Sequence, residues 1–159
     1  MKSAAGKSGG FSLVELIITM ALLGMMAAIA IPAFFSYNQN VNLKSAVREI
    51  TSDIYLAREK SVSENRKHRI SFSLADNNYV VEQGTSSGSP YTGIETKVMA
   101  SFGSGVRLTA VSFGGNPAIV FQTRGTTEAG TVSLQNDRGS AATITTTLTG
   151  RTYVQYALQ

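Results

Sequence analysis

The first hydrophobic pattern in the chain is a long, almost unbroken apolar run. From Phe11 to Ile31 nearly every residue is apolar, and Glu15 is the one charged residue. At about 1.5 Å per residue, a helix of this length spans the roughly 30 Å hydrocarbon core of a bilayer. The run therefore predicts a membrane-spanning helix that carries a single acid near its start.

The second pattern is an apolar stripe with helical spacing. Its members recur at steps of three and four residues, while the charged residues of the same segment mostly lie off the stripe: Leu43, Val47, Ile50, Ile54, Ala57 and Ser61. Pro32 lacks an amide donor, so we expect it to end or kink the membrane helix before the chain continues helical. We predict one long helix over roughly residues 12–64, with its stripe packed on a sheet.

The third pattern alternates with period two and begins near residue 67. Arg69–Leu74 and Tyr79–Glu82 read as a hairpin around the turn 76–78, and the Gly- and Ser-rich segment 84–93 reads as a loop. The run 143–149 is rich in Thr, which favours an edge or solvent-facing strand. Further strands are expected near residues 97–102, 106–113, 118–122, 131–135, 143–148 and 152–157. A helix followed by such strands predicts an α+β fold.

The charges before the apolar run predict its orientation. Lys2 and Lys7 precede the run, so the positive-inside rule places the N-terminus in the cytoplasm and exports everything after residue 36. No A-x-A-like cleavage site follows the run, so the hydrophobic helix is expected to stay with the mature protein. The expected division is a processing segment at 1–10, a transmembrane and assembly helix at 11–36, and a periplasmic unit at 37–159.

Glu15 needs a positive partner, because a carboxylate at the centre of a bilayer costs about 2.5–3.5 kcal/mol on insertion scales. Cleavage after Gly10 would create one, since the new α-amine of Phe11 would lie four residues before Glu15 on the same helical face. The acid would pair with that amine or with the amine of a neighbouring copy. The alternative is a snorkelling acid near the end of an ordinary anchor.

These N-terminal residues resemble the type IV pilins and the type II secretion pseudopilins. In that superfamily a short basic leader ends in Gly and is followed by Phe, with Glu as the fifth residue of the mature hydrophobic helix, as at Gly10, Phe11 and Glu15. Gly24 and Pro32 resemble the helix-loosening Gly and Pro of these proteins. The resemblance implies cleavage after Gly10 by prepilin peptidase and N-methylation of Phe11. It also implies growth of a helical filament at an inner-membrane assembly platform.

The C-terminal half resembles the GspH/FimT group, which comprises H-type pseudopilins and related minor pilins. The resemblance rests on the Phe121-x-x-Arg124-Gly125-Thr126 pattern, on the strand after Gly130 and on Gly150-Arg151. It implies a pilin-like fold in which a long N-terminal helix packs on a small antiparallel β-sandwich. Many major pilins close a C-terminal loop with a disulfide, whereas this chain has no Cys.

Composition excludes several kinds of chemistry. His68 is the only His and there is no Cys, so a Cys–His nucleophile pair and a multi-His zinc site are excluded. The acids show no calcium-loop spacing and no phosphate-binding P-loop is present. We therefore expect no enzyme activity, no metal and no cofactor. The net charge of +4 falls to +2 without Lys2 and Lys7, which is too mild to require a nucleic-acid partner.

Two basic features have both a structural and a DNA-binding interpretation. Arg66, Lys67 and Arg69 follow the long helix, where cations offset the helix dipole and cap its carbonyls. Some minor pilins of the resembling group bind DNA through a C-terminal Gly-Arg-x-Arg, and here Gly150-Arg151 matches while Tyr153 replaces the second Arg. Tyr153 and Tyr156 would stack on bases or, as is usual for alternating aromatics, belong to the core.

The sequence thus predicts a structural subunit of a filament: a minor pilin or pseudopilin, held in the bacterial inner membrane and incorporated near the filament tip. Its expected partners are other pilins, prepilin peptidase and the assembly platform. Three alternatives remain open at this stage. These are membership of a type IV pilus as against a secretion pseudopilus, a DNA-binding minor pilin for natural transformation, and a plain single-pass membrane protein with a periplasmic domain.

Overall fold

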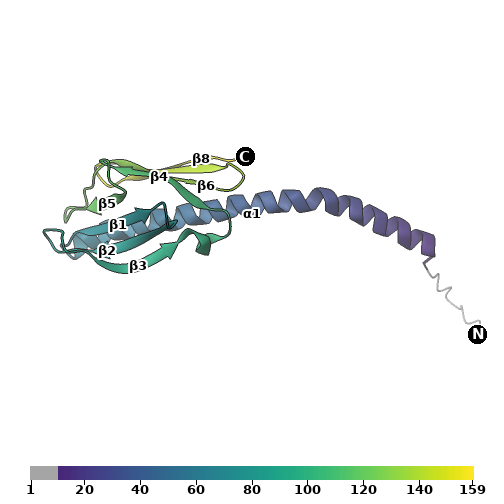
Figure 1. Cartoon of the computed structure of the whole chain (residues 1–159), viewed down its shortest axis with the longest axis horizontal. Coiled ribbons are helices and arrows are strands. Elements are labelled where there is room, and N and C mark those ends of the chain that lie inside the picture. Colours follow the sequence, from purple (N-terminus) through teal and green to yellow (C-terminus); the bar gives the residue numbers. More distant parts are fainter. Residues whose placement is uncertain (1–10) are drawn as a thin grey trace, which may run out of the picture. The chain divides into compact units, whose positions relative to one another are not determined.

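The computed structural model describes residues 11–159, so the predicted leader, including Gly10, lies outside the described residues. The chain divides into two compact units, one ending at Ser36 and one formed by Tyr37–Gln159. Helix α1, Leu13–Ser63, contributes to both units (Figure 1). The prediction of one long helix is confirmed to within about one residue at each end. The helix runs through Pro32 without a break, so of the two expected effects of Pro32, an end or a kink, the end is wrong.

Eight strands follow α1 in the part of the chain that the structure describes, and they form two antiparallel sheets. The first sheet has the order β3-β2-β1-β5 and the second has the order β4-β6-β7-β8, so the hairpin predicted around residues 76–78 is the pair β1–β2. The bounds are β1 His68–Ser73, β2 Asn78–Gln83, β3 Thr92–Val98, β4 Arg107–Phe113, β5 Ala118–Phe121, β6 Gly130–Gln135, β7 Ala141–Thr146 and β8 Thr152–Ala157.

The second half of α1 and the inner faces of both sheets share one hydrophobic core, as expected for a helix packed on a sandwich (Figure 1). The predicted stripe is confirmed, because its members are at most 1 % exposed: Leu43, Val47, Ile50, Ile54, Ala57 and Ser61. Ile70 and Phe121 come from the first sheet, and Leu134 and Ile144 from the second. Alternation along each strand directs one side chain in two toward this core.

Three predictions about the strands are wrong. The strand expected at 97–102 lies earlier, at β3, and Met99–Phe102 forms a short 3₁₀ helix in its place. The Thr-rich segment is no edge strand, because β7 lies between β6 and β8 and buries Ile144 and Thr146. Tyr153 and Tyr156 in β8 are 54 % and 42 % exposed, so they lie outside the core.

Candidate assembly site

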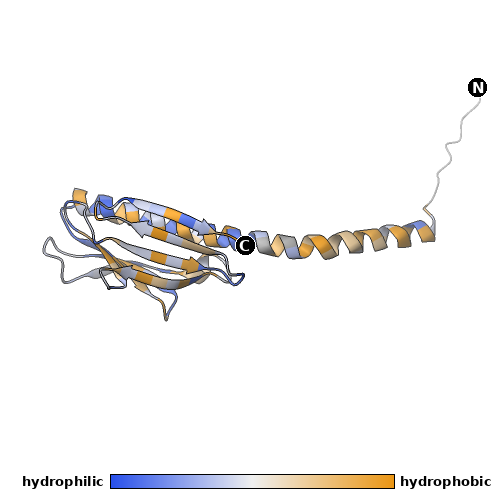
Figure 2. Cartoon of the chain, turned by 90° about the horizontal axis from the view of Figure 1, so that it is seen from above, coloured by the Kyte–Doolittle hydropathy of each residue, from blue (hydrophilic) through white to orange (hydrophobic). Residues whose placement is uncertain are grey.

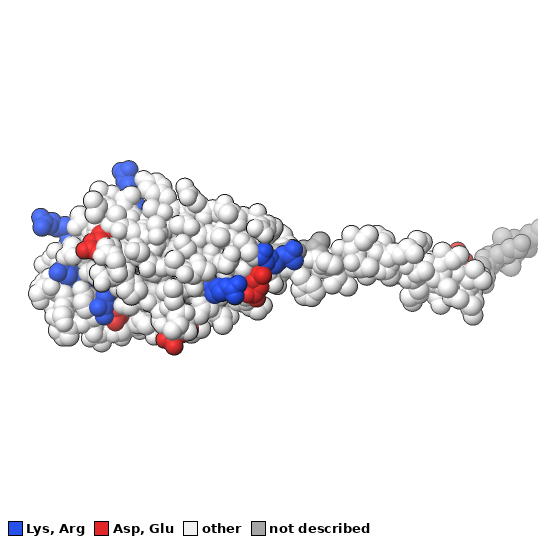
Figure 3. Space-filling model, turned by 45° about the horizontal axis from the view of Figure 1, so that its top comes forward, with Lys and Arg blue, Asp and Glu red and all other residues white. Residues whose placement is uncertain are grey.

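The apolar half of α1 has no partner within its own unit. An 18-residue window of the helix has a mean hydropathy of 2.3 and is 0 % buried, which by length and composition is enough to cross a membrane. Its large apolar side chains are more than half exposed on every side of the helix, from Leu13 to Phe35. Figure 2 shows this half almost uniformly hydrophobic, and Figure 3 shows it nearly free of charge. A helix that is apolar all round needs lipid or other helices around it.

Ser12 caps the start of this helix beside the predicted cleavage site. The Glu15 amide donates to Ser12 Oγ at 3.2 Å, and the Leu16 amide donates to the Ser12 carbonyl at 3.2 Å. Ser12 and Glu15 therefore have the S-x-x-E spacing of a capping box, a local signal that our sequence analysis missed. Phe11, which is 81 % exposed, precedes the helix, while Glu15 lies in its first turn, where the helix dipole favours an acid.

Gly24 lies within the apolar half and faces no other part of residues 11–159. A Cβ built at Gly24 would meet no atom within 4 Å outside the neighbouring backbone of the helix. The missing side chain therefore serves no packing within the described residues. Gly24 and Ala28, four residues apart, leave a shallow strip on which another helix can pack closely.

The basic residues after α1 do not cap its carbonyls. Lys67 Nζ donates to the Ser87 carbonyl at 2.9 Å, and Arg69 binds Glu82 through two hydrogen bonds of 2.5 and 3.0 Å. The guanidinium carbon of Arg69 also lies 4.1 Å from the centroid of the Tyr91 ring. Arg66 is exposed. The capping interpretation is thus wrong for Lys67 and Arg69, and the charge of Arg69 is already neutralised by Glu82.

The C-terminal turn places a different set of arginines near one another. Gly150 packs against the Arg58 side chain and the Gly125 carbonyl, to which Arg58 Nε also donates at 3.1 Å. The exposed residues Arg124 and Arg151 therefore lie on neighbouring turns. The structure thus associates Arg151 with Arg58 and Arg124, neither of which was predicted from the sequence as a DNA contact. Within the described residues, no hydrogen bond or ion pair joins Arg151 to Arg66, Lys67 or Arg69.

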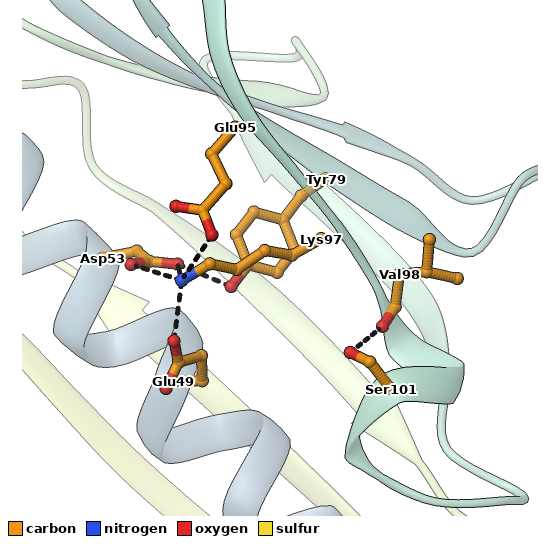
Figure 4. Close-up of polar contacts among 7 residues, drawn as sticks. All are labelled: Glu49, Asp53, Tyr79, Glu95, Lys97, Val98 and Ser101. Carbon is orange, nitrogen blue, oxygen red and sulfur yellow. Dashed lines mark hydrogen bonds and ion pairs between the residues drawn. The ribbon is translucent and has the colours of Figure 1, made fainter.

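A polar cluster missed by the sequence analysis ties the first sheet to α1. Lys97 Nζ lies 2.7 Å from Glu49 Oε1 and 2.9 Å from Asp53 Oδ2, and Tyr79 Oη donates to Asp53 Oδ2 at 2.6 Å. Figure 4 shows Lys97 reaching across from β3 toward the two acids of the helix. Asp53 is only 7 % exposed, although its charge suggested a position off the buried stripe. Lys97 lies in a segment expected to be a strand, but nothing in the sequence paired it with residues over forty positions away.

The cluster shifts the pKa values of its members. Burial opposes the charge of Lys97, but the hydrogen bonds to Glu49 and Asp53 outweigh burial and raise the pKa of the ammonium above 10.5. Burial and then the hydrogen bond to Asp53 raise the pKa of the Tyr79 phenol well above 10. On the outer face of the same sheet, burial opposes the charge of Glu82, but hydrogen bonds from Arg69 and Ser71 lower the pKa of that carboxyl below 4.5.

His68 is a buried core residue of β1. Its side chain is 0 % exposed, and Glu64 Oε2 lies 3.5 Å from Nε2, which is too long for a good hydrogen bond. Within residues 11–159 no three His, Cys, Asp or Glu side chains gather as metal ligands. The cluster of Lys97, Glu49, Asp53 and Tyr79 therefore joins α1 to the first sheet, whereas the pair of Arg69 and Glu82 joins β1 to β2.

Comparison with known protein families assigns both halves of the chain. The family model described as type II transport protein GspH matches residues 46–150, and the prokaryotic N-terminal methylation motif matches residues 6–31. Two curated proteins named fimbrial protein, from Pseudomonas aeruginosa, are each 34 % identical over 70 residues. This match covers 44 % of the chain and 45 % of each relative, so the chain spans about half the length of the curated relatives it matches.

Solved structures share the fold at low sequence identity. The minor pseudopilin EpsH from the type 2 secretion system of Vibrio cholerae superposes with a TM-score of 0.60 at 10 % identity, covering 72 % of this chain and 97 % of EpsH. The type IV minor pilin FimU of Pseudomonas aeruginosa gives a TM-score of 0.58 at 16 % identity, covering 75 % and 92 %. The GspH family model matches more than half of the chain, which also carries the methylation motif and shares the fold of EpsH and FimU, so the chain belongs to the GspH family.

Proposed function

We propose that the chain is a low-copy structural subunit, incorporated near the tip of a type IV pilus or a secretion pseudopilus. The observation that carries this proposal is the all-round apolar half of α1, together with the match of residues 6–31 to the N-terminal methylation motif. Such a helix is stable in a bilayer before assembly and among other such helices afterwards. The N-terminus then lies in the cytoplasm and the Tyr37–Gln159 unit in the periplasm.

The proposed processing step makes the charge pair that assembly uses. Prepilin peptidase cleaves between Gly10 and Phe11, and methylation follows on the new amine of Phe11. The Ser12 cap leaves Phe11 outside the helix, where an amine on it is free to meet a carboxylate. Glu15 is costly when unpaired in lipid, so pairing it with the amine of a neighbouring subunit favours insertion into a filament at the membrane platform.

The experiment that tests this proposal is mass spectrometry of sheared filaments beside the membrane fraction. Mature peptides that begin at methylated Phe11, at a low ratio to a major pilin, are expected in one of the two fractions. Their presence in sheared filaments assigns the chain to a surface pilus, and their presence in the membrane fraction alone assigns it to a periplasmic pseudopilus. An intact, unmethylated N-terminus would instead show a plain single-pass membrane protein.

Glu15→Ala separates insertion from assembly. We expect the variant to insert and to be cleaved as the parent is, because removing an acid lowers the cost of insertion. We expect its incorporation into filaments to fall at least about tenfold, the factor that corresponds to losing about 1.4 kcal/mol of pairing. Quantitative immunoblots of filament and membrane fractions measure both steps. Normal incorporation would contradict the pairing of Glu15.

DNA binding is a second candidate function, supported by the arginines on neighbouring turns. Arg124 and Arg151 are exposed near the partly buried Arg58. Phosphate contacts make binding strongly salt-dependent, so titration of the protein with duplex DNA at 50 and 200 mM salt is the test. Arg151→Gln should weaken binding, whereas Arg69→Gln should not, because Glu82 already pairs with Arg69. No binding at 50 mM salt would exclude this function.

A further inference from the structure

The four edge strands of the two sheets differ in how they resist pairing with a further strand. Edge strands are commonly protected by charges, bulges, Pro or shortness. In the first sheet, β3 carries Glu95 and Lys97, and β5 has only four residues after Pro117. In the second sheet, the register of β4 shifts between Leu108 and Ala110. Strand β8 has none of these features, since it has six uncharged residues in regular register with β7.

The backbone of β8 shows which of its peptide groups are open. Thr152 O accepts a hydrogen bond from Tyr55 Oη at 3.3 Å, so this carbonyl is directed away from β7. Arg151 O, one position earlier, accepts from the Thr147 amide at 2.9 Å and is directed toward the β7 side. Because these directions alternate along an antiparallel strand, the peptide groups of Val154 and Tyr156 also point to the open edge.

A groove lies directly beside this edge. Thr51, Ser52 and Tyr55 of α1 line one wall, and Val154 and Tyr156 of β8 line the other. The side chains of Tyr55 and Tyr156 are 46 % and 42 % exposed, so both rings leave apolar surface open to solvent. Arg48 lies at the same groove, and no ion pair to it is found among the described residues. A strand added to β8 would cover these rings and extend the second sheet over the exposed side of α1.

We propose that the open edge of β8 binds an extended segment of a neighbouring filament subunit by strand addition. The inference rests on the proposed role as a filament subunit. The groove is lined partly by α1, the helix whose earlier turns carry the proposed assembly surface, so a neighbouring subunit held along that helix is the occupant that we propose. The segment would place apolar side chains over Tyr55 and Tyr156 and an acidic one near Arg48, while its backbone pairs with Val154 and Tyr156.

Site-specific photo-cross-linking in assembling cells tests the proposal with a matched pair of positions. A benzophenone amino acid replaces Tyr156 in the groove or Ile94 on the protected edge strand β3, which is similarly exposed at 51 %. We expect Tyr156 to cross-link to an extended segment of another pilin-class subunit, mapped by peptide mass spectrometry, and Ile94 not to do so. Equal cross-linking at both positions, none at Tyr156, or attachment to a partner helix would overturn the proposal.

Val154→Pro removes an amide donor at the edge and also replaces a side chain that packs against the core. The Val154 amide points away from β7, so Pro removes a donor for the added strand without removing a ladder hydrogen bond within the sheet. We expect the yield of the cross-link from position 156 to fall about tenfold, which corresponds to the loss of roughly one backbone hydrogen bond to the added strand. Tyr153→Ser, on the other face of β8, is the control and should leave the cross-link unchanged. An unchanged cross-link in Val154→Pro would contradict strand addition.

The two proposals fail in different ways. If mature peptides do not begin at Phe11, the filament role itself fails. If the processed protein enters filaments normally while position 156 stays uncross-linked, only the strand-addition site fails. Thermal unfolding of Val154→Pro reports whether the variant folds. If it does not fold, the comparison of cross-linking at positions 156 and 94 in the parent sequence still tests strand addition.

Discussion

The two halves of α1 differ in where their apolar side chains find partners. In the half after Tyr37, a narrow stripe at steps of three and four is buried against the protein's own sheets, with Ile50 and Ile54 at 0 % exposure. In the half before it, apolar side chains surround the helix and Leu23 is 60 % exposed. One continuous helix thus carries a surface for folding and a second surface that we propose contacts the membrane and the filament.

This difference gives the largest expected effect. Ile54→Ala should lower the free energy of unfolding of the Tyr37–Gln159 unit by about 2–5 kcal/mol, because it removes buried methyl groups and leaves a cavity. Leu23→Ala is the matched change in the exposed half and should leave that unfolding transition in place. Thermal unfolding of the two detergent-extracted variants followed by near-ultraviolet circular dichroism measures both. Equal destabilisation by the two substitutions would contradict the conclusion that only the second half of α1 belongs to the folded core.

The link between α1 and the first sheet gives the next effect. Lys97→Met leaves Asp53 buried with only Tyr79 as partner, and breaking a buried pair in this way costs about 3–5 kcal/mol; the partial exposure of Lys97, 15 %, puts the expected loss at the lower end. Adding Asp53→Asn removes the unpaired charge and should recover part of the loss. Chemical denaturation of the single and double variants tests the link. A single variant as stable as the parent would show that the cluster contributes little.

The sequence predicted best what depends on neighbours along the chain. The apolar run, the stripe of α1 and the β1–β2 hairpin each follow from a local period. The Lys97 cluster was missed because its residues are distant in sequence and meet only after α1 packs on β3. Tyr153 and Tyr156 were misplaced for a related reason: alternation predicts two faces for β8, but only strand order shows that β8 is an edge.

In the candidate assembly site, too, local signals were easier to predict than distant contacts, with Ser12 as an exception. Phe11 and Glu15 were selected from their spacing and from the family resemblance that this spacing carries, whereas the capping role of Ser12 was overlooked although its signal is local. The basic residues Arg66, Lys67 and Arg69 were grouped because they are adjacent in sequence. Their contacts separate them, because Arg69 binds Glu82, Lys67 donates to the Ser87 carbonyl and Arg66 is exposed, and no sequence period encodes these contacts.

The outer face of the first sheet gives a smaller, pH-dependent effect. The lowered pKa of Glu82 means that its carboxylate stabilises the fold above about pH 4.5 and that this contribution is lost as pH falls through the lowered pKa. Glu82→Gln should therefore cost about 1–2 kcal/mol at pH 7, and the cost should shrink toward zero in acid. Unfolding titrations of parent and variant from pH 7 to pH 3 measure it. The exposed Glu59→Gln is the control, and a pH-independent difference would contradict the assignment.

The smallest effect concerns the first turn of α1 and sharpens the contrast between its halves. This turn has no tertiary packing among the described residues, so its stability rests on the Ser12 cap and on Glu15 near the helix dipole. Ser12→Ala should destabilise the turn by about 1 kcal/mol, which corresponds to roughly fivefold faster amide hydrogen exchange at Glu15 and Leu16 in micelles. Ser12→Asp, which keeps a capping oxygen, should restore slow exchange. Exchange that is equally slow in Ser12→Ala would mean that the surrounding lipid alone fixes the start of the helix, and the amine of Phe11 would then owe its position to the membrane and not to the cap.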